Sequence, residues 1–462
     1  MGKVDLVKVI YKLYIFFLPF QMFSFLHFPG IFSNYLFINA SSVFMWVGLI
    51  LIIIIMNGLK IPYNSGVKLF SNLYFFMALY SLLAAIILFF PFGELNGENT
   101  LRASIGDIIF YFIVLCSIYY NWYCLSYVID FRELKSILYM ESIFLLIIGY
   151  IQLSFIWGFN GLSGLYSSIG SVVQLLEPSR LNRGVVFGGT EPSSAANLCL
   201  LVIPFHLTMI WNNQNKIINL LFIFLYIPLF LSSDSSTVVI LLFILIITVI
   251  VMVVSSSVKP YRILAVVSFC VGMIIAICYG IDSFVNYTVE FDENSIQYLL
   301  LGKIFDTSSL SNAMRSSTII NDMKIFFSYP FTGIGNGLQG YLYNSNMPEW
   351  VRRSSEVQSI ISGSAGIVDG GGAFFPVLLS GFGLCGIAVF AYFVRSYYTH
   401  YISSGIVETE LNIIFKFFII AFLCAGWYGI GVEQNQYVAF LLALPIVEYQ
   451  LKGEYMGLGE TE

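Results

Sequence analysis

Two segments of the chain carry side chains that together suit chemistry on a phosphate-bearing substrate. Arg183 and Glu191 lie on either side of a glycine-containing stretch, and Arg315 lies at the start of a helical pattern further along the chain. A guanidinium binds phosphate oxygens in pairs and stabilises the charge of a departing phosphate. A carboxylate can take the proton from an attacking hydroxyl. We therefore predict a group-transfer site in which Arg183, Arg315 and Glu191 act on an anionic, phosphate-bearing lipid.

A purely structural role for Glu191 is the alternative. Glu191 precedes an apolar run that begins near residue 193, so it lies close to the positive end of a helix dipole and could pair with Arg183. It would then only orient the arginine, and the phosphate of the substrate would assist deprotonation. Asp369 and Glu356 are the next candidates for the base. The sequence leaves these possibilities open.

Glycines and further arginines in the same two segments extend the predicted site. After Arg315, apolar residues recur at helical spacing and end at a turn with three glycines over residues 333–337. Such a turn can bind phosphate through its backbone, although glycine clusters more often only mark loops. The arginines near residue 352 could hold a second lipid-linked substrate or contact anionic headgroups. The predicted substrate-binding residues are Arg180, Arg352, Arg353, Gly333, Gly335 and Asp369.

The composition places this chemistry in a membrane. Hydrophobic residues make up 58% of the 462 residues and charged residues only 10%, which excludes a soluble globular protein. Apolar runs of about 20 residues are long enough to cross about 30 Å of hydrocarbon as helices. We predict an all-α, polytopic integral membrane protein with about twelve transmembrane helices, built as a single domain over residues 1–462. The spans are centred on 9–28, 35–57, 68–91, 105–128, 135–157, 193–211, 217–232, 236–255, 262–282, 373–395, 411–431 and 437–450.

Lysines and arginines in the short loops determine the predicted orientation. Lys3, Lys8 and Lys12 precede or open the first span, which we interpret as a retained helix and not as a signal peptide. Both termini are then cytoplasmic, and residues 158–192 and 283–372 form two long segments outside. The second of these segments should contain an amphipathic helix that lies at the membrane interface.

Cysteine and histidine give no sign of a metal or redox site. The 7 cysteines fall within apolar spans, where they are typical small buried side chains. The 3 histidines are far apart and do not have the spacing of metal ligands. We therefore expect no metal, no cofactor, no disulfide framework and no nucleic-acid partner.

Three short motifs, taken in order, resemble a known family. The stretch Arg-Gly-Val-Val-Phe-Gly-Gly-Thr-Glu-Pro-Ser at residues 183–193 resembles the signature that enters a central helix of bacterial O-antigen and capsule polymerases. These Wzy-type enzymes belong to the O-antigen ligase and polymerase superfamily. Arg315 followed by Gly-Ile-Gly-Asn-Gly at residues 333–337 is similar to their second loop motif, and residues 380–386 resemble the helix that follows. The resemblance covers roughly residues 180–390, and the first five spans agree only in character.

Two departures from the family pattern bear on the type of reaction. Many relatives have an arginine in a serine-rich stretch where this chain has Asp234, so we interpret residues 231–237 as a polar helix cap. Ligases of the superfamily are described with a histidine before the helix that corresponds to residues 373–395, and this chain has Asp369 nearby instead. The missing histidine favours a polymerase over a ligase.

The resemblance implies a GT-C-like fold and a multi-pass glycosyltransferase of the bacterial cytoplasmic (inner) membrane. It implies a polyprenyl-pyrophosphate-linked oligosaccharide as substrate, with the growing glycan transferred to a lipid-linked repeat unit on the outer face by inverting, metal-independent displacement. The implied partners are membrane lipid, a chain-length-determining co-polymerase and a flippase. An O-antigen ligase-type transferase, or a flippase or transporter with a similar number of spans, is the alternative.

Overall fold

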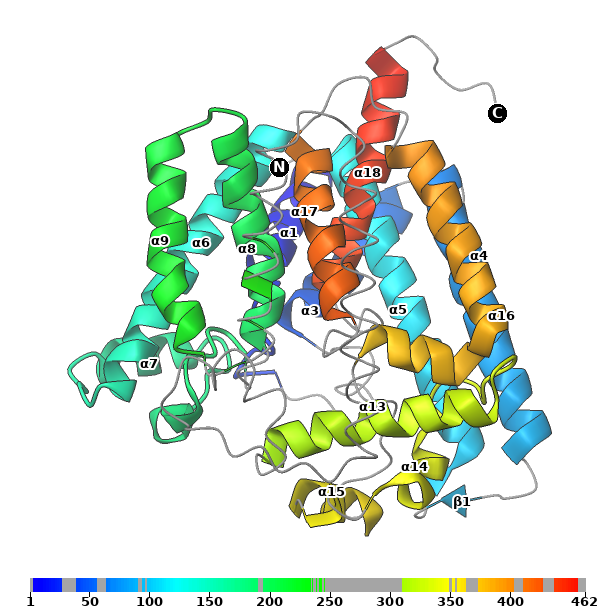
Figure 1. Ribbon diagram of the computed structural model, residues 1–462. Helices are drawn as coiled ribbons and strands as arrows, with labels where there is room; N and C mark the ends of the chain where they lie inside the picture. The colour runs from blue at the N-terminus through cyan, green and yellow to red at the C-terminus, as the bar shows by residue number, and fades with distance from the viewer. Residues whose placement is uncertain are drawn as a thin grey trace.

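Long apolar helices stand side by side in the computed structural model and make this an α-helical membrane protein (Figure 1). The structure describes residues 3–26, 39–55, 64–89, 94–95, 98–189, 194–233, 310–348, 351–353, 355–362, 373–402, 410–426 and 436–455, with a few isolated positions between 235 and 245. Within these ranges, four helices are long and apolar enough to cross a membrane, over Ser65–Ile87, Ile108–Tyr127, Phe131–Ile156 and Phe374–Tyr401. Shorter apolar helices cover Ala40–Ile55, Leu198–Trp211, Lys216–Leu231 and Gln436–Leu451.

The upright helices of the bundle are α1 (Lys3–Phe16), α3 (Ala40–Ile55), α4 (Ser65–Ala84), α5 (Thr100–Tyr127), α6 (Phe131–Ile156), α8 (Ser194–Trp211), α9 (Lys216–Leu231), α16 (Phe374–Tyr397), α17 (Glu410–Ala425) and α18 (Gln436–Tyr455). The remaining helices are α7 (Ser163–Gly170), α13 (Leu310–Ser328), α14 (Gly340–Asn346), α15 (Ser355–Ile361) and the 3₁₀ helices η3 (Pro178–Arg183) and η5 (Val351–Arg353). Single π-helical turns, η1 (Ala85–Phe89) and η6 (Tyr398–Ile402), continue α4 and α16. The described strands, β1 (Glu94–Leu95) and β2 (Glu98–Asn99), pair antiparallel.

The bundle has two ends with different structures (Figure 1). α1 begins and α18 ends at one of them, which we call the terminal end, while α7, α13, α14 and α15 lie at the opposite, loop end. At the terminal end, Lys8 and Lys12 both pair with Glu133 at the start of α6, with N–O distances of 2.8 and 3.0 Å. Asp130 caps the same helix, because its Oδ1 accepts the backbone N–H of Glu133 at 2.8 Å. Two lysines that the sequence assigns to the cytoplasmic side are therefore paired at the terminal end.

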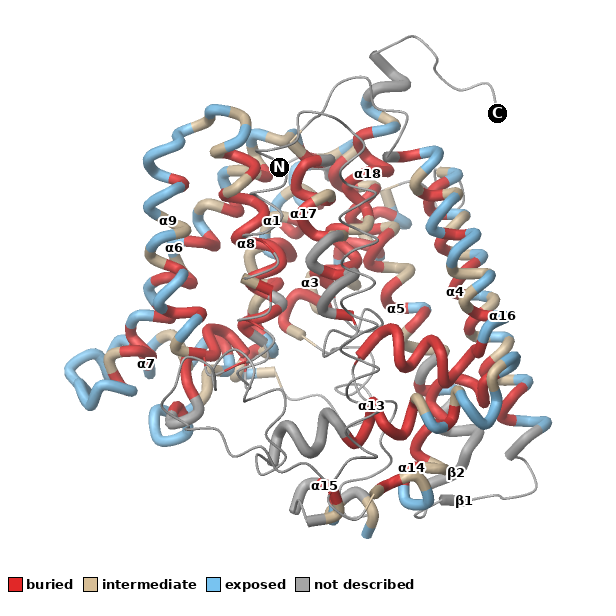
Figure 2. Tube along the Cα trace, in the orientation of Figure 1, coloured by how far each residue is buried: buried red, intermediate tan, exposed pale blue. Residues whose placement is uncertain are grey.

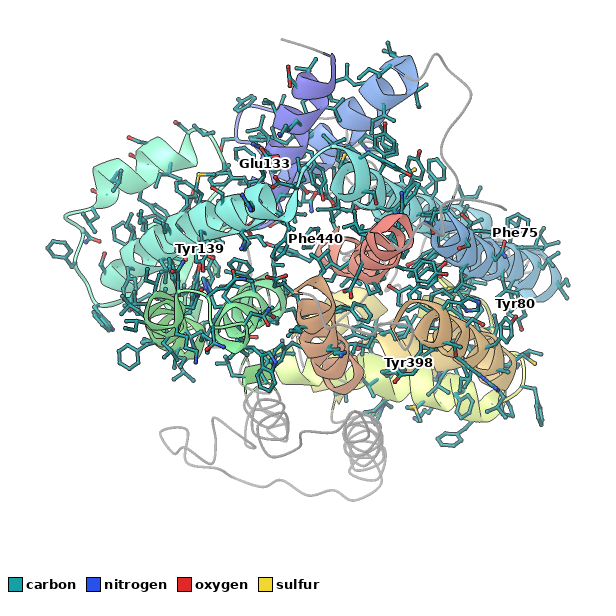
Figure 3. The ribbon with its side chains drawn as sticks, turned by 90° about the horizontal axis from the view of Figure 1, so that it is seen from above. Phe75, Tyr80, Glu133, Tyr139, Tyr398 and Phe440 are labelled. Atoms are coloured by element: carbon teal, nitrogen blue, oxygen red, sulfur yellow. The ribbon has the colours of Figure 1, made fainter. Side chains whose placement is uncertain are left out.

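The side chains form a buried centre and an apolar rim. Figure 3 looks along the bundle and shows Phe440 of α18 near its middle and Phe75 of α4 at its rim. Buried polar groups pair with one another: Tyr11 donates to Asn121 Oδ1 at 2.9 Å, and the Asn121 amide donates to the Tyr14 hydroxyl at 2.9 Å. Isoleucine, leucine and phenylalanine side chains are exposed on the outside of α3, α4 and α9, as expected for helices in contact with lipid.

The first span has other bounds than the predicted 9–28. α1 covers Lys3–Phe16, and residues 17–26 form turns and irregular backbone. Leu18 precedes a proline, a position that disfavours the α conformation, and the Phe20 carbonyl accepts the backbone N–H of Ala40 at 3.0 Å. The apolar run continues beyond the helix because these later residues pack into the core instead of extending the span.

The other predicted spans divide into described and undescribed ones. Spans predicted over 105–128 and 135–157 correspond to α5 and α6, with ends that differ by a few residues. The span predicted over 262–282 lies outside the described residues, and the one over 236–255 does so except at isolated positions. The total of about twelve spans therefore stays a prediction.

α13 lies crosswise to the upright helices at the loop end (Figure 1). The sequence predicts an amphipathic helix within residues 283–372, and a helix is present over Leu310–Ser328. Protein covers both of its faces, because α16 packs on one side and α14 and α15 on the other. Ile320 and Ile325 are buried, and so are the polar Asn321 and Asp322 (Figure 2). Buried polar residues of α13, such as Asn321 and Asp322, therefore make contacts inside the protein.

Candidate functional site

A buried loop separates two of the predicted catalytic residues, Arg183 and Glu191. Arg183 ends η3, and residues 184–189 then run between α6, the end of α9 and the turn after α1. Val185 and Phe187 are buried in this loop. The side chain of Arg183 and the whole of Glu191 lie outside the described part of the chain. The 184–189 loop therefore connects the backbone of Arg183 to the segment that contains Glu191.

Gln152 of α6 holds the 184–189 loop by its backbone. Its Oε1 accepts the backbone N–H of Val186 at 3.0 Å and that of Phe187 at 2.8 Å. Its Nε2 donates to the carbonyl of Phe187 at 2.8 Å and to the hydroxyl of Tyr166 at 3.0 Å. Phe187 has a φ of 54°, which is strained for a residue with a side chain. The Gln152 amide thus satisfies buried backbone groups that no regular element pairs, and it stabilises an unfavourable backbone conformation.

Gly184 brings the 184–189 loop against the end of α9. Its φ of 109° and ψ of −176° lie in a region that essentially only glycine adopts. A Cβ atom here would lie 2.5 Å from the carbonyl oxygen of Ser232, and that same oxygen accepts the backbone N–H of Val185 at 2.9 Å. Ser232 is the C-cap residue of α9. The serine-rich stretch thus ends a helix, as the sequence predicts, and it also anchors the residue next to Arg183.

The structure brings the two predicted segments to the same end of the bundle. η3, with Arg180 and Arg183, and α13, with Arg315, both lie at the loop end, and α13 begins on the side where α8 and α9 stand (Figure 1). η5, with Arg352 and Arg353, packs against α13 and α15. All five predicted arginines therefore belong to one end of the molecule, although they come from distant parts of the chain.

The structure describes the charged site residues to different extents. Arg180 is exposed, with its Nε 3.8 Å from the Glu177 carboxylate, and exposed pairs of this kind contribute little stability. Its guanidinium is therefore accessible to a substrate anion. The backbones of Arg315 and Arg353 lie in α13 and η5, but their side chains are outside the described part of the structure. Asp369 lies outside it entirely.

Arg352 makes contacts inside the protein. Its Nη2 donates to the carbonyl of Asn344 at 2.6 Å, and its Nε donates to the carbonyl of Met347 at 3.3 Å. These bonds tie η5 to the end of α14. Positioning the loop is therefore a role that the structure supports for Arg352, while substrate binding stays a prediction.

The glycine-rich turn at residues 329–337 pairs with a break in α16. The break is at Gly383, which has a φ of 58° and a ψ of −157°. The carbonyl of Ser380 accepts the backbone N–H of Ile334 at 2.9 Å, and the next carbonyl accepts that of Gly335 at 2.8 Å. The last carbonyls before the break therefore have partners in the turn.

The second half of α16 begins on the same turn. The N–H of Leu384 donates to the carbonyl of Pro330 at 2.8 Å, and the next N–H donates to that of Phe331 at 3.1 Å. Irregular backbone is tolerated at membrane depth only where such groups are paired within the protein. The N–H of Gly333 also bonds within the turn, at 2.9 Å. Gly333 and Gly335 stay predicted binding residues, but their N–H groups already have protein partners.

Replacing Gly383 with alanine should destabilise this pairing. A Cβ atom would lie 2.6 Å from the carbonyl carbon of Phe331, and the glycine conformation is unfavourable for alanine. Because the contacted atoms belong to the backbone and the glycine conformation itself is strained for alanine, we expect a loss of at least about 1–3 kcal/mol of stability. Gly381→Ala is the matched control, since its Cβ would approach no atom closer than 3.4 Å. Thermal unfolding in detergent should separate the two variants, and equal melting temperatures would contradict the argument.

A buried polar cluster, not predicted from the sequence, links α13 to α16 and α5. The Ser380 hydroxyl donates to Asp322 Oδ1 at 3.1 Å, and Gln339 Nε2 donates to Asn336 Oδ1 at 3.1 Å and contacts Ser380 Oγ at 3.3 Å. Asn336 Nδ2 donates to the Tyr111 hydroxyl at 2.6 Å. One sequence signal was available, because Asp322 lies two helical turns after Arg315 and thus on the same face of the helix. The cluster fixes the helix that carries Arg315 against the bundle.

Glu141 is a buried carboxyl group in the middle of α6. Neither of its oxygens has a hydrogen-bond partner among the described residues, and the hydroxyls of Tyr226 and Tyr437 lie close enough to interact with it electrostatically. A carboxyl group at this depth in a membrane helix is unusual and often functional. Protein encloses it in this structure, so it does not lie on the surface of the loop end.

Neither a metal-binding group nor a surface cleft places the functional site elsewhere in the described structure. Among the described residues, no group of three or more His, Cys, Asp or Glu side chains could hold a metal ion. A cleft of about 430 Å³ opens at the terminal end, and its charged lining residues are Lys8, Asp130 and Glu133. Because Lys8 and Glu133 pair with each other, the cleft has no free arginine or lysine cluster for a phosphate.

Comparisons with protein-family models, with curated proteins and with solved structures found no match to this chain. A functional assignment therefore depends on the residues and on their arrangement.

Proposed function

We propose that this protein is a polysaccharide polymerase of the Wzy type. It transfers a growing glycan from polyprenyl pyrophosphate to a lipid-linked repeat unit at the outer face of the bacterial cytoplasmic membrane. The observation that carries the proposal is that η3 and α13 lie at the same end of the bundle, the loop end, because these elements hold Arg183 and Arg315. A lipid-linked pyrophosphate presents its charge where a membrane protein can place such residues, at the boundary between lipid and water.

The positions of the basic residues support an outer-face site. Lys8 and Lys12 lie at the terminal end, together with the start of α1 and the end of α18 (Figure 1). By the positive-inside rule this end faces the cytoplasm, so the loop end faces outward. The positive-inside rule does not favour arginines at the loop end. An anionic substrate would explain why they are there.

The reaction is a single displacement at the anomeric carbon of the donor sugar. Arg183 and Arg315 bind the pyrophosphate, which keeps the electron pair of the broken C–O bond and gains charge in the transition state. Glu191 takes the proton of the acceptor hydroxyl, whose oxygen attacks from the opposite side and inverts the centre. The 184–189 loop supports this step because Gln152 and Ser232 hold it from both sides. A loop held in one conformation next to the arginine lowers the cost of orienting the reacting groups.

The other predicted residues have secondary roles in this proposal. Arg180, Arg353 and Asp369 contact the glycan or the second lipid-linked substrate. Gly333 and Gly335 position α13 through their bonds to the turn and to α16. A chain-length-determining co-polymerase and a flippase are the expected protein partners.

A lipid-linked oligosaccharide flippase is the second candidate, because α16 is a broken helix. Discontinuous helices are common in carriers, where the freed backbone groups bind the transported ion or substrate. Here the freed groups at Gly383 pair with the glycine-rich turn instead. A ligase-type transferase would use the same arginines on a different acceptor.

A glycan ladder from the native host tests the proposal. A strain lacking the gene should keep a single repeat unit on its acceptor and lose the longer polymer. The wild-type gene should restore the ladder, while Arg183→Ala, Arg315→Lys and Glu191→Gln should not. Lysine retains the charge of Arg315 but not its paired donors, so this variant tests bidentate recognition. Arg395→Ala, an exposed arginine at the terminal end of α16, is the matched control and should restore the ladder.

Two results would overturn the polymerase assignment. Persistence of the ladder in the deletion strain would show that another protein makes the polymer. Loss of even the single repeat unit would indicate a flippase or a ligase. Each variant must reach the membrane at the wild-type level, so that lost activity is not lost protein.

A further inference from the structure

The segment that follows α6 projects sideways from the bundle with an apolar surface. α7 lies beyond the rim, level with the ends of α6 and α9 at the loop end (Figure 1), and most of it is exposed (Figure 2). Trp157, Phe159 and Leu165 are 77%, 59% and 51% exposed. From Trp157 to Leu176 the sequence contains no acidic residue, no basic residue and no histidine. A loop surrounded by water normally carries charged side chains. The exposed apolar side chains and the lack of charge therefore indicate that this surface contacts an apolar partner.

Several contacts attach the projecting segment to the bundle. Its apolar side chains are therefore exposed as a consequence of the fold. The ring of Tyr166 is only 4% exposed and packs edge-on against Phe155, with 5.2 Å between ring centroids. The Tyr166 hydroxyl donates to the carbonyl of Leu176 at 2.8 Å and accepts the Gln152 amide at 3.0 Å. Ser24 holds the end of α7, because its hydroxyl donates to the carbonyl of Gly170 at 2.6 Å.

α7 has two different sides. Leu162 and Leu165 lie three residues apart and share one side of the helix, while Ser163 and Ser167 lie on the opposite side. The Ser167 hydroxyl donates to the carbonyl of Gly164 at 3.0 Å and faces solvent. The helix is therefore amphipathic without any charge, a pattern suited to the boundary between lipid and water.

The length of α6 places this segment at that boundary. Glu133, which pairs with two lysines, marks the headgroup level at the start of α6. About 20 helical residues cross the hydrocarbon core. Counted from Leu134, the far side of the core is reached close to residue 154, so Trp157 falls into the next interfacial layer. Tryptophan is enriched in this layer of membrane proteins.

We propose that residues 157–172 form an interfacial foot that inserts its apolar side into the phospholipid leaflet at the loop end. Trp157, Phe159, Leu162 and Leu165 contact the lipid, while Ser163 and Ser167 face water. The lipid surface is the favoured occupant because the foot continues the apolar rim of α6 and α9 at the correct depth. The foot holds Tyr166 against Gln152, so it also connects the membrane surface to the 184–189 loop. The proposal needs only the membrane-spanning bundle, and it stands or falls independently of the polymerase assignment.

Fluorescence quenching in nanodiscs tests the foot directly. The chain has 6 tryptophans, so the emission of Trp157 is obtained as the difference between the wild type and Trp157→Phe. Phosphatidylcholine with brominated acyl chains should quench most of this difference emission, and aqueous iodide should quench little of it. Quenching by iodide alone would place the foot in water. Quenching by neither would indicate a protein partner or a second copy, and either result would overturn the proposal.

A pair of charge substitutions provides a second readout. Leu165→Glu places a carboxylate on the lipid-facing side of α7, and Ser167→Glu places the same group on the opposite side. We expect Leu165→Glu to reduce the bromine quenching of Trp157 and to lower the melting temperature in nanodiscs, while Ser167→Glu leaves both unchanged. Equal behaviour of the two variants would contradict insertion of this side into lipid.

Discussion

Gly184→Ala should detach the 184–189 loop from the end of α9. We expect this variant to lose its activity even though Arg183 and Glu191 are unchanged. Alanine would have to adopt a φ of 109°, and its Cβ would lie 2.5 Å from the carbonyl oxygen of Ser232. A strained backbone costs about 1–3 kcal/mol, and overpacking a buried site costs about as much again. The expected loss of roughly 2–6 kcal/mol is a large part of the stability of a typical protein.

Gly164→Ala is the matched control for Gly184→Ala. No atom lies within 4 Å of the Cβ position at Gly164, which is exposed on α7. Thermal unfolding in detergent and the glycan ladder should both separate the two variants. If Gly184→Ala unfolds at the wild-type temperature and restores the ladder, the loop does not need its observed conformation.

Gln152→Leu should have a comparable effect on the same loop by a different cause. Leucine has a similar size but leaves the N–H groups of Val186 and Phe187 and the carbonyl of Phe187 without their partner. A buried polar group that loses its hydrogen bond costs about 1–3 kcal/mol. We expect the free energy of unfolding to fall by several kcal/mol, or by less if the loop moves so that water can bind the freed groups. The ladder should be shortened or absent.

Gln174→Leu is the control for the glutamine substitution, because Gln174 is exposed in the segment between α7 and η3. The melting temperature of this variant should match that of the wild type. Hydrogen exchange of residues 184–189 should be faster in Gln152→Leu than in Gln174→Leu. Unchanged exchange in Gln152→Leu would mean that other contacts, such as the bond to Ser232, are enough to hold the loop.

Both loop substitutions help to interpret the arginine variants. Arg183→Ala removes a candidate phosphate ligand next to a loop whose described bonds are made by backbone groups and Gln152. Its melting temperature should therefore stay near that of the wild type while the ladder is lost. A variant that loses the ladder at normal stability has a defect in chemistry or binding, whereas Gly184→Ala and Gln152→Leu should lose both.

The sequence determined the helices most reliably where apolar residues formed a long uninterrupted run. α5, α6 and α9 could be located in this way because a membrane helix pairs its backbone groups within itself. Its position can therefore be predicted without knowing which other segments it contacts. The helix that begins before Arg315 was also predictable, because its apolar residues recur at helical spacing. Composition alone established the membrane class.

Only the tertiary structure decided how these elements meet. The early end of α1, the pairing of the glycine-rich turn with the break at Gly383, and the hold of Gln152 on the 184–189 loop all depend on residues that are distant in the sequence. The cluster of Asp322 and Ser380 is of the same kind. Local patterns report which side chains are apolar and where glycine occurs. They do not report which distant carbonyl or N–H group a residue will face, and those pairings determine the shape of the candidate site.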